Sequence, residues 1–320
     1  MNNTSLEKQK KQEAVRISTV KAPEQHVLVS EETSTRVRMR HVLLLGAMTA
    51  LGPLSSLPSL PTISHELGAT MSQTQITLTA SLFGVALGQM LIGPISDARG
   101  RRGPLLVGMI LYTLTSLLCL AAPSVGLLIV LRFVQGVAAA AGIVISLAIA
   151  RDLYAGRALA RCISLLMMVN FLAPMFAPVL GGQLLSFTSW RGVFVTLALI
   201  GVVIVLVVVL GLGETLQPED RQSGGVSASL SDFRHLLLDG RFVGLALSLG
   251  FTFAAIFVYI SSSPFIFENL YGLLPQNASV VYGINALGVP IMAQVNARLI
   301  DRVSPQQLLI GEPWCLPVVL

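Results

Sequence analysis

Residues 76–103 read ITLTASLFGVALGQMLIGPISDARGRRG, an apolar stretch over 76–96 that runs directly into a short loop rich in arginine. A helix needs about 20 mostly apolar residues to cross the hydrocarbon core of a bilayer, and 76–96 has that length. Backbone groups in hydrocarbon must hydrogen-bond within their own segment, so the stretch is expected to be helical. It therefore predicts a membrane span that ends in a basic loop.

Further stretches of the same kind follow along the chain. Hydrophobic residues make up 53% of the sequence and charged residues only 12%, whereas soluble domains carry about 25% charged residues. The apolar segments lie at about 42–63, 76–96, 104–122, 126–150, 163–186, 192–212, 241–263 and 277–297. Each is long enough to cross a bilayer as a helix. The chain is therefore predicted to be an all-α polytopic membrane protein.

The basic residues predict how these spans are oriented. They gather in the N-terminal tail and in the loops after the second, fourth, sixth and eighth spans, whereas the opposite loops hold only Arg191. Because cytoplasmic loops carry an excess of Lys and Arg, the N-terminus is predicted to be cytoplasmic. The net charge of +5 is therefore explained by basic residues in the loops that are predicted to be cytoplasmic. Nucleic-acid binding would need a clustered basic face on a soluble module and is not expected.

The N-terminal tail, residues 1–41, is polar and is expected to be disordered because it cannot bury a core. No cleavable signal peptide is visible, and the first apolar stretch is expected to act as an uncleaved signal anchor. The three cysteines, Cys119, Cys162 and Cys315, have no pair spacing. They are interpreted as small hydrophobic residues rather than as disulfide partners or metal ligands. No cofactor and no metal are expected.

An internal repeat organises the spans. The loop after the second span contains Asp97 and the loop after the eighth contains Asp301, an offset of 204 residues. The same offset relates the starts of those two spans, and a parallel duplication of a six-helix unit explains it. The predicted regions are a disordered cytoplasmic tail (1–41), a six-helix bundle (42–212), a cytoplasmic linker (213–240), the first two spans of a second bundle (241–305) and an aberrant or incomplete ninth span (306–320).

The repeat also predicts that the second six-helix unit is incomplete. The sixth span ends near 212, and its counterpart would end beyond residue 320. Glu312, Pro313 and Pro317 make the last segment unsuited to crossing lipid as a helix. Alternating access requires one half of such a transporter to rock against the other. The chain alone is therefore expected to be inserted in the membrane, unstable and inactive.

The loop between the second and third spans has the composition of a tight, charged turn. It contains Gly93, Asp97, Gly100, Arg101 and Arg102. Glycine suits a short turn, and the charges can pair with helix ends and neighbouring loops. Each residue alone fits an ordinary positive-inside loop. Together they favour a latch that holds one state of a rocking bundle.

Arg132 lies inside the fourth apolar span, in LRFVQGVAAAAG. A charge within a span is expensive to place and is by default a hypothesis of function. The alternative is an anchor that extends its guanidinium to the nearby outer surface. Gln135 lies one turn away and is expected to share a face with Arg132. Gly136 is expected to allow close helix packing.

The fifth span contains APMFAPVLGG, in which Pro174 and Pro178 lie four residues apart and Gly181 and Gly182 follow. Two prolines at this spacing kink a helix and free backbone carbonyls. The alternative interpretation is ordinary packing plasticity. We favour a hinge or an occluding seam.

These motifs together resemble the major facilitator superfamily. The loop after the second span is similar to the signature loop of that family, and Arg132, Gln135 and Gly136 resemble its fourth-span motif. The APMFAPVLGG segment resembles the fifth-span motif of drug:proton antiporters. The Arg151-Asp152, Trp190-Arg191 and Gly213-Glu214-Thr215 segments resemble the Bcr/CflA drug-resistance branch. The resemblance covers about residues 42–305.

The resemblance implies a major facilitator fold, here with one complete six-helix bundle and an incomplete second one. It implies export of small hydrophobic or amphipathic drugs, similar to chloramphenicol or bicyclomycin, across the bacterial inner membrane in exchange for protons. The partners would be drugs, protons and the lipid bilayer. Arg132 would tune the protonation of a carboxyl group. Arg101 and Asp152, which end adjacent spans at the same membrane face, would form a charge pair.

The chain departs from the family pattern at two places. The first span has Ser55 and Ser56 where the branch carries an acidic residue, and no Asp or Glu lies inside any predicted span, so no proton carrier is identified. In the signature loop, Ala98 stands where a basic residue is expected. The alternative hypotheses are a truncated or frameshifted, non-functional transporter fragment, and a membrane-embedded enzyme. The enzyme is disfavoured because the four histidines all lie in tails or loops.

Overall fold

The computed structural model describes residues 55–221 and 236–274, with isolated residues at 45–46, 52, 233, 277–278, 280–281 and 284. The predicted tail 1–41, the segment 306–320 and most of the eighth span lie outside these residues. Within the described residues every regular element is a helix of the α, 3-10 or π type. The fold class is therefore all-α, as the sequence predicts.

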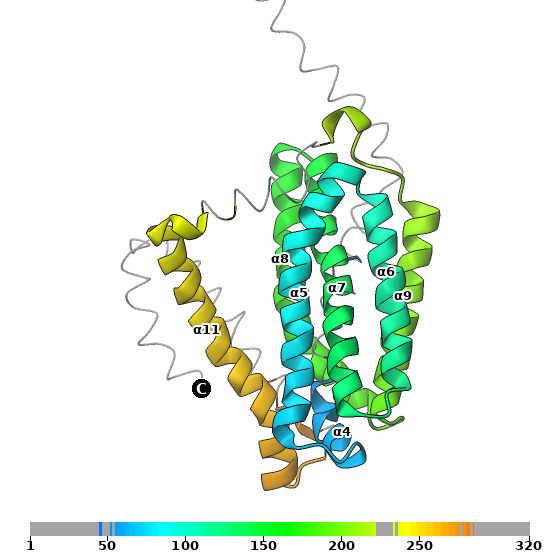
Figure 1. Cartoon of the computed structure of the whole chain (residues 1–320), viewed down its shortest axis with the longest axis vertical. Coiled ribbons are helices and arrows are strands. Elements are labelled where there is room, and N and C mark those ends of the chain that lie inside the picture. The colour runs from blue at the N-terminus through cyan, green and yellow to red at the C-terminus, as the bar shows by residue number, and fades with distance from the viewer. Residues whose placement is uncertain are drawn as a thin grey trace, which may run out of the picture.

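Long helices run side by side in a bundle (Figure 1). They are α5 (Met71–Arg99), α6 (Arg102–Leu120), α7 (Val125–Leu153), α8 (Gly156–Leu184) and α9 (Trp190–Gly211). A further long helix, α11 (Gly240–Phe265), stands beside them. The short elements are η1 (Leu57–Ser59), α4 (Leu60–Glu66), η2 (Pro218–Asp220) and the π-helical turn η3 (Ile266–Leu270).

The long helices have the length and composition of membrane spans. In the part of the chain that the structure describes, five helices qualify: α5, α6, α7, α9 and residues 240–259 of α11. Their outward faces carry large apolar side chains, such as Val107, Leu199 and Phe251, which are 68%, 61% and 73% exposed. Lipid would cover these side chains, because a soluble protein rarely exposes so much contiguous apolar surface. The chain is a polytopic membrane protein.

Some helices begin well before the predicted apolar spans. The second span was expected over 76–96, yet α5 begins after a capping box at Thr70 and Gln73 and ends at Gly100, whose φ is 92°. Helix α8 begins at Gly156, well before the predicted residue 163. At 1.5 Å per residue, a 29-residue helix is roughly 44 Å long, more than the ~30 Å hydrocarbon core. Hydropathy marks only the part of each helix that lies in hydrocarbon.

The centre of the bundle is formed by α5, α6, α7 and α9. Small residues allow these helices to approach closely, and residues 138–141 of α7 are all buried alanines. One apolar cluster joins Met109 of α6, Ile145 of α7 and Ile204 of α9. A second cluster joins Tyr112 of α6 and Trp190 of α9. These buried clusters hold the helices together between the polar groups at the two ends of the bundle.

Helix α11 meets the bundle near its own C-terminal end. Phe265 is buried with Leu57, Leu60, Leu78 and Ala177 in one apolar cluster. Towards its N-terminal end α11 diverges from α5 in the view of Figure 1, and no described residue of its spanning part, 240–259, is fully buried. The helix therefore closes against the bundle at the α4 end and stands open at the opposite end.

Candidate functional site

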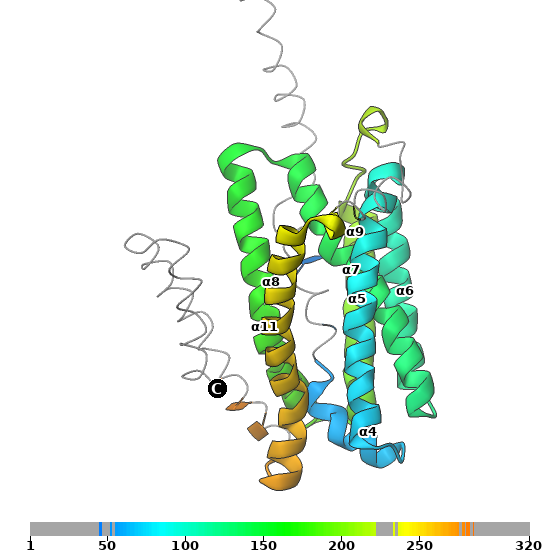
Figure 2. The same cartoon turned by 60° about the vertical axis from the view of Figure 1, so that its left-hand side comes forward.

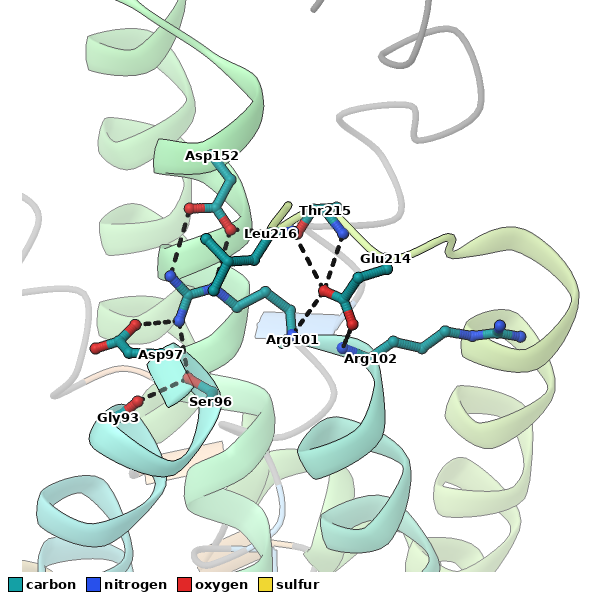
Figure 3. A network of polar contacts seen from close by, with 9 residues as sticks. All are labelled: Gly93, Ser96, Asp97, Arg101, Arg102, Asp152, Glu214, Thr215 and Leu216. Atoms are coloured by element: carbon teal, nitrogen blue, oxygen red, sulfur yellow. Dashed lines mark hydrogen bonds and ion pairs between the residues drawn. The ribbon is translucent and has the colours of Figure 1, made fainter. Parts of the chain in front are cut away.

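The loop after α5 forms a polar network at one end of the bundle (Figure 3). The guanidinium of Arg101 donates a hydrogen bond from Nε to Oδ2 of Asp152, at the end of α7, over 2.9 Å. It also pairs with Asp97 and donates from Nη1 to the hydroxyl of Ser96 over 2.9 Å. The predicted contact between Arg101 and Asp152 is therefore present.

The Arg101 side chain is only 8% exposed. Burial opposes its charge, but the hydrogen bonds from Arg101 to Asp152 and Asp97 outweigh burial and raise the pKa of Arg101 above its ordinary value. Arginine stays protonated at every physiological pH in any case. The consequence is structural: a charge that is removed from water is held in place by two carboxylates.

Glu214, directly after α9, is a member of this network that the sequence interpretation did not include. Its carboxylate accepts the backbone N–H of Arg101 at 2.7 Å and that of Arg102 at 3.3 Å. These donors lie at the N-terminus of α6, where unpaired N–H groups and the helix dipole favour a negative charge. Thr215 adds a hydroxyl that donates to Asp152 Oδ2 over 3.2 Å. The network thus joins the ends of α5, α6, α7 and α9.

The glycines of this loop have different roles. Gly100 has a positive φ, and a Cβ there would lie 2.5 Å from Oε2 of Glu214, so another residue would disturb the network. The carbonyl of Gly93 accepts a hydrogen bond from the Ser96 hydroxyl at 2.8 Å.

The two other arginines of the predicted latch differ in their contacts. Arg102 donates to the carbonyl of Val209 in α9 at 3.0 Å. Arg151 is exposed and lies outside the network, although the sequence placed it among the latch residues.

Arg132 lies inside the bundle and is 1% exposed. Its Nη1 donates to Oε1 of Gln135 at 2.7 Å, and Gln135 in turn donates to the hydroxyl of Ser116 in α6 at 2.6 Å. The guanidinium also stacks over the ring of Phe194 in α9, with 5.7 Å from Cζ to the ring centroid. The side chain is directed into the helix packing, which does not fit the alternative of an anchor that reaches the outer surface.

The proline-glycine segment of α8 packs against the end of the first predicted span. Helix α8 is continuous through Pro174 and Pro178, and Pro178 and Gly182 are buried. A Cβ at Gly181 would lie 2.0 Å from the carbonyl oxygen of Ser55. Only glycine permits this approach. The segment therefore forms a close seam with residues 55–58.

A smaller polar cluster lies at the opposite end of the bundle. Oε2 of Glu66 accepts the indole N–H of Trp190 at 2.8 Å and Nη1 of Arg191 at 2.5 Å. These hydrogen bonds lower the pKa of Glu66, and the bond from Trp190 has a larger effect than the bond from Arg191. Glu66 therefore stays ionised at neutral pH and joins α4 to the start of α9.

The two ends of the bundle differ in charge. Arg99, Arg101, Arg102, Arg151 and Arg157 lie at the end where α5 and α7 finish, whereas Arg191 lies at the other end. The grouping of loops that the sequence predicted is therefore present. In the described ranges, no group of three or more His, Cys, Asp or Glu side chains could hold a metal ion.

The chain is similar to a known protein family and to several bacterial proteins. The model of a family described as the Major Facilitator Superfamily matches residues 42–312. The uncharacterized MFS-type transporter YdgK of Bacillus subtilis is 43% identical over 257 residues, which are 79% of this chain and 64% of that protein. A bicyclomycin resistance protein homolog of Haemophilus influenzae is 30% identical over 271 residues, or 84% of this chain and 68% of that protein.

The multidrug resistance protein MdtL of Klebsiella pneumoniae is 32% identical over 236 residues, which cover 72% of this chain and 58% of that protein. The chain thus spans about two thirds or less of the length of these relatives. Among solved structures, the partially occluded inward-open xylose transporter XylE of E. coli aligns with a TM-score of 0.62 at 13% identity, covering 82% of this chain and 70% of that one. An inward-facing bacterial homolog of the human lysosomal transporter Spinster aligns with a TM-score of 0.63 at 18% identity. The alignment covers 83% of this chain and 63% of that one.

Proposed function

Because the chain belongs to the major facilitator superfamily, whose members move small molecules across membranes, we propose that it exports hydrophobic or amphipathic drugs in exchange for protons. The observation that carries the proposal is its identity of 30–32% with two relatives named for bicyclomycin and multidrug resistance. Both alignments cover more than 70% of this chain. The xylose transporter, at 13% identity, bears on the fold alone.

The geometry supports an assigned role for each part of the site. The Arg101 network joins the ends of α5, α6, α7 and α9, and would hold these ends together as one body while the bundle rocks. Helix α11 touches the bundle at the α4 end and diverges at the network end, which suits an inward-facing state. The buried Arg132 would tune the proton affinity of a carboxyl group when the transporter is loaded.

We propose the Bcr/CflA branch for this chain and the inner membrane of a bacterium for its location. The sequence offered three hypotheses. The comparisons do not favour the non-functional fragment, and the family and the relatives are transporters rather than enzymes.

Drug accumulation in cells tests the proposal. Bacteria expressing the chain, and bacteria expressing a version extended to the length of its relatives, are loaded with radiolabelled chloramphenicol with and without a protonophore. Lower accumulation than in empty-vector cells, abolished by the protonophore, is the expected result for the extended version. Accumulation equal to the empty vector in both strains, with the proteins present in the membrane, would contradict export of this drug class.

Asp152→Asn is expected to slow drug efflux by roughly 10-fold, because a charge-assisted hydrogen bond contributes about 1.5–3 kcal/mol. The amide keeps the size of the side chain but leaves the nearly buried Arg101 with Asp97 as its remaining anionic partner. Initial efflux rates of the extended version, at matched expression, provide the measurement. Asp220→Asn, an exposed carboxylate on the same side of the bundle, is the control and should match the wild type. An Asp152→Asn variant with normal efflux would show that the pair has no part in transport.

The orientation is also a proposal, which charge asymmetry supports. A cysteine introduced at Asn277 is expected to react with a membrane-impermeant maleimide added outside intact cells, whereas one at Ser223 should react only after permeabilisation. The measured quantity is the fraction of each variant labelled. Labelling of the Ser223 cysteine from outside would reverse the assignment of the two ends.

A further inference from the structure

The proposed exchange requires a group that binds a proton, and the described helices contain no Asp or Glu in their interiors. The carboxylates in the described part of the chain are Glu66, Asp97, Asp152, Glu214, Glu219, Asp220, Asp239 and Glu268. All of them lie at or beyond helix ends. The proton-binding group of this region must therefore be sought among these end residues.

Most of these carboxylates accept hydrogen bonds or are exposed to water. Glu66 accepts hydrogen bonds from Trp190 and Arg191. Asp97, Asp152 and Glu214 belong to the Arg101 network. Asp239 accepts the backbone N–H of Arg241 at the start of α11, and Glu219 and Asp220 are exposed. Each of these seven carboxylates therefore has a hydrogen-bonding partner or lies in water.

Glu268 is different. It lies in η3, just beyond the end of α11, and its Oε1 is buried without a hydrogen-bond partner. The residue as a whole is partly exposed, but a carboxylate oxygen that is buried without a partner pays a desolvation penalty that the protonated form avoids. Burial alone raises the pKa of Glu268 to about 8. In this conformation the carboxyl group therefore holds a proton at neutral pH.

Charged neighbours do not account for this behaviour. The elements that pack against the end of α11 are η1, α4 and α5, with Ala177 of α8. Among them, α4 carries His65 and Glu66, which are exposed. The charged residues of α5 and α8 lie at the far ends of those helices, and η1 has none. The raised pKa of Glu268 has burial as its cause, so it depends on how closely this end of the molecule is packed.

The position of Glu268 links burial to conformation. Three residues before it, Phe265 is inserted between Leu57, Leu60 and Leu78 of the bundle. This contact is where α11 closes against the bundle, at the end opposite the Arg101 network (Figure 2). Separation of α11 from α4 would bring water to η3, and the pKa of Glu268 would return towards its ordinary value of 4.5.

We propose that Glu268 is a proton-binding residue of the exchange, taking up a proton from water on the α4 side as α11 closes against the bundle. The step is the protonation of one carboxylate oxygen, with no other bond formed or broken. It rests on the proposed proton-coupled function, and it supplies the acidic group that the first span, with Ser55 and Ser56, does not. An antiporter that has released its drug outside would return to the inward-facing state by this uptake.

The direction of the pH dependence follows from linkage. The closed state, in which α11 contacts the bundle, is the state in which the pKa of Glu268 is raised, so protonation of Glu268 stabilises this state. The stabilisation is complete below a pH of about 4.5 and is lost as the pH rises through about 8. Acidification from pH 8.5 to pH 6 should increase the ratio of closed to open molecules by about tenfold or more. Glu268→Gln, a neutral amide that imitates the protonated acid, should stay closed at both values.

Chemical modification tests the protonation directly on the intact chain. Dicyclohexylcarbodiimide reacts with protonated carboxyl groups in apolar surroundings, and its adducts are located by mass spectrometry of peptides. Glu268 is expected to be the main modified carboxyl in the described region, and its modification should fall as pH rises through about 8. Glu66, exposed and ion-paired, is the internal control. No adduct at Glu268, or a midpoint near 4.5, would overturn the proposal.

Spin labels test the conformational link. Cysteines at Thr70 and Leu274, on the two sides of the α4 junction, report its opening as a distance distribution in lipid nanodiscs. The wild type should shift to short distances on acidification, Glu268→Gln should not respond, and Glu219→Gln should behave as the wild type. Equal pH responses in the wild type and Glu268→Gln would refute the link. No drug is present in either experiment, so a failure of drug export would contradict the proposed function without deciding the role of Glu268.

Discussion

Replacing Arg132 with alanine in the version extended to the length of the relatives is expected to abolish drug efflux, a loss of roughly 100-fold, while the protein still inserts in the membrane. The guanidinium lies 1% exposed among α6, α7 and α9. Removing it leaves the Gln135 amide without its partner at 2.7 Å, and each charged hydrogen bond is worth about 1.5–3 kcal/mol. The protein also loses the positive charge that would tune a nearby proton site.

The comparison with lysine and methionine separates charge from geometry. Arg132→Lys keeps the charge but cannot reproduce the planar contact with Phe194 or several donors at fixed angles, so efflux is expected to recover only in small part. Arg132→Met keeps much of the volume without any charge and should match the alanine variant. Efflux rates at equal amounts of inserted protein are the measurement. Full efflux by Arg132→Ala would mean that the arginine serves only in packing or anchoring.

Local pattern predicted much of this site, because helical spacing and loop position are written in neighbouring residues. Gln135 was expected on the face of Arg132 from its spacing of three residues, and the hydrogen bond between them is present. Arg101 was expected near Asp152 because both end adjacent spans at the same face. The resemblance to a transporter family drew on the same short segments, and the family match bears it out.

What the sequence did not predict depends on contacts between distant segments. Glu214 lies 113 residues from Arg101 along the chain, and the resemblance of its segment to a transporter branch did not indicate that it contacts Arg101. The same holds for Ser116 and Phe194 around Arg132. The sequence interpretation did not single out Glu268, because the apolar pattern ends before it, whereas the burial of its Oε1 comes from packing at the end of α11. Burial of a loop residue is a tertiary property, and periodicity carries no signal for it.

The seam between α5 and α7 shows how small residues and tertiary contact combine. The sequence identified Gly136 as a close-packing residue, although not its partner. In the structure a Cβ at Gly136 would lie 2.0 Å from the carbonyl oxygen of Ser81 in α5. Reciprocally, a Cβ at Gly84 would lie 2.2 Å from the carbonyl oxygen of Phe133 in α7. Each helix therefore presents a glycine to the other's backbone, which leaves no flexible side chain to move aside.

Gly136→Ala is accordingly expected to destabilise the bundle strongly, although it adds a single methyl group and alanine is the better helix former. The helices must separate by about an ångström or more, and overpacking of this kind costs about 1–3 kcal/mol, occasionally more. Thermal unfolding in detergent, followed by the fluorescence of a thiol-reactive dye at the buried Cys119, gives the midpoint. The Gly136→Ala variant should unfold at a markedly lower temperature and accumulate to a lower level in membranes.

Gly126→Ala is the matched control, since it places the same methyl group on the same helix where nothing lies within 4 Å. It should unfold at or slightly above the wild-type temperature, because alanine lowers the entropy of the unfolded chain. The difference between the two variants isolates the contact with Ser81 from the effect of helix propensity. If both variants unfolded at the wild-type temperature, α5 and α7 would have to lie farther apart than the structure places them, and the seam would not hold the bundle together.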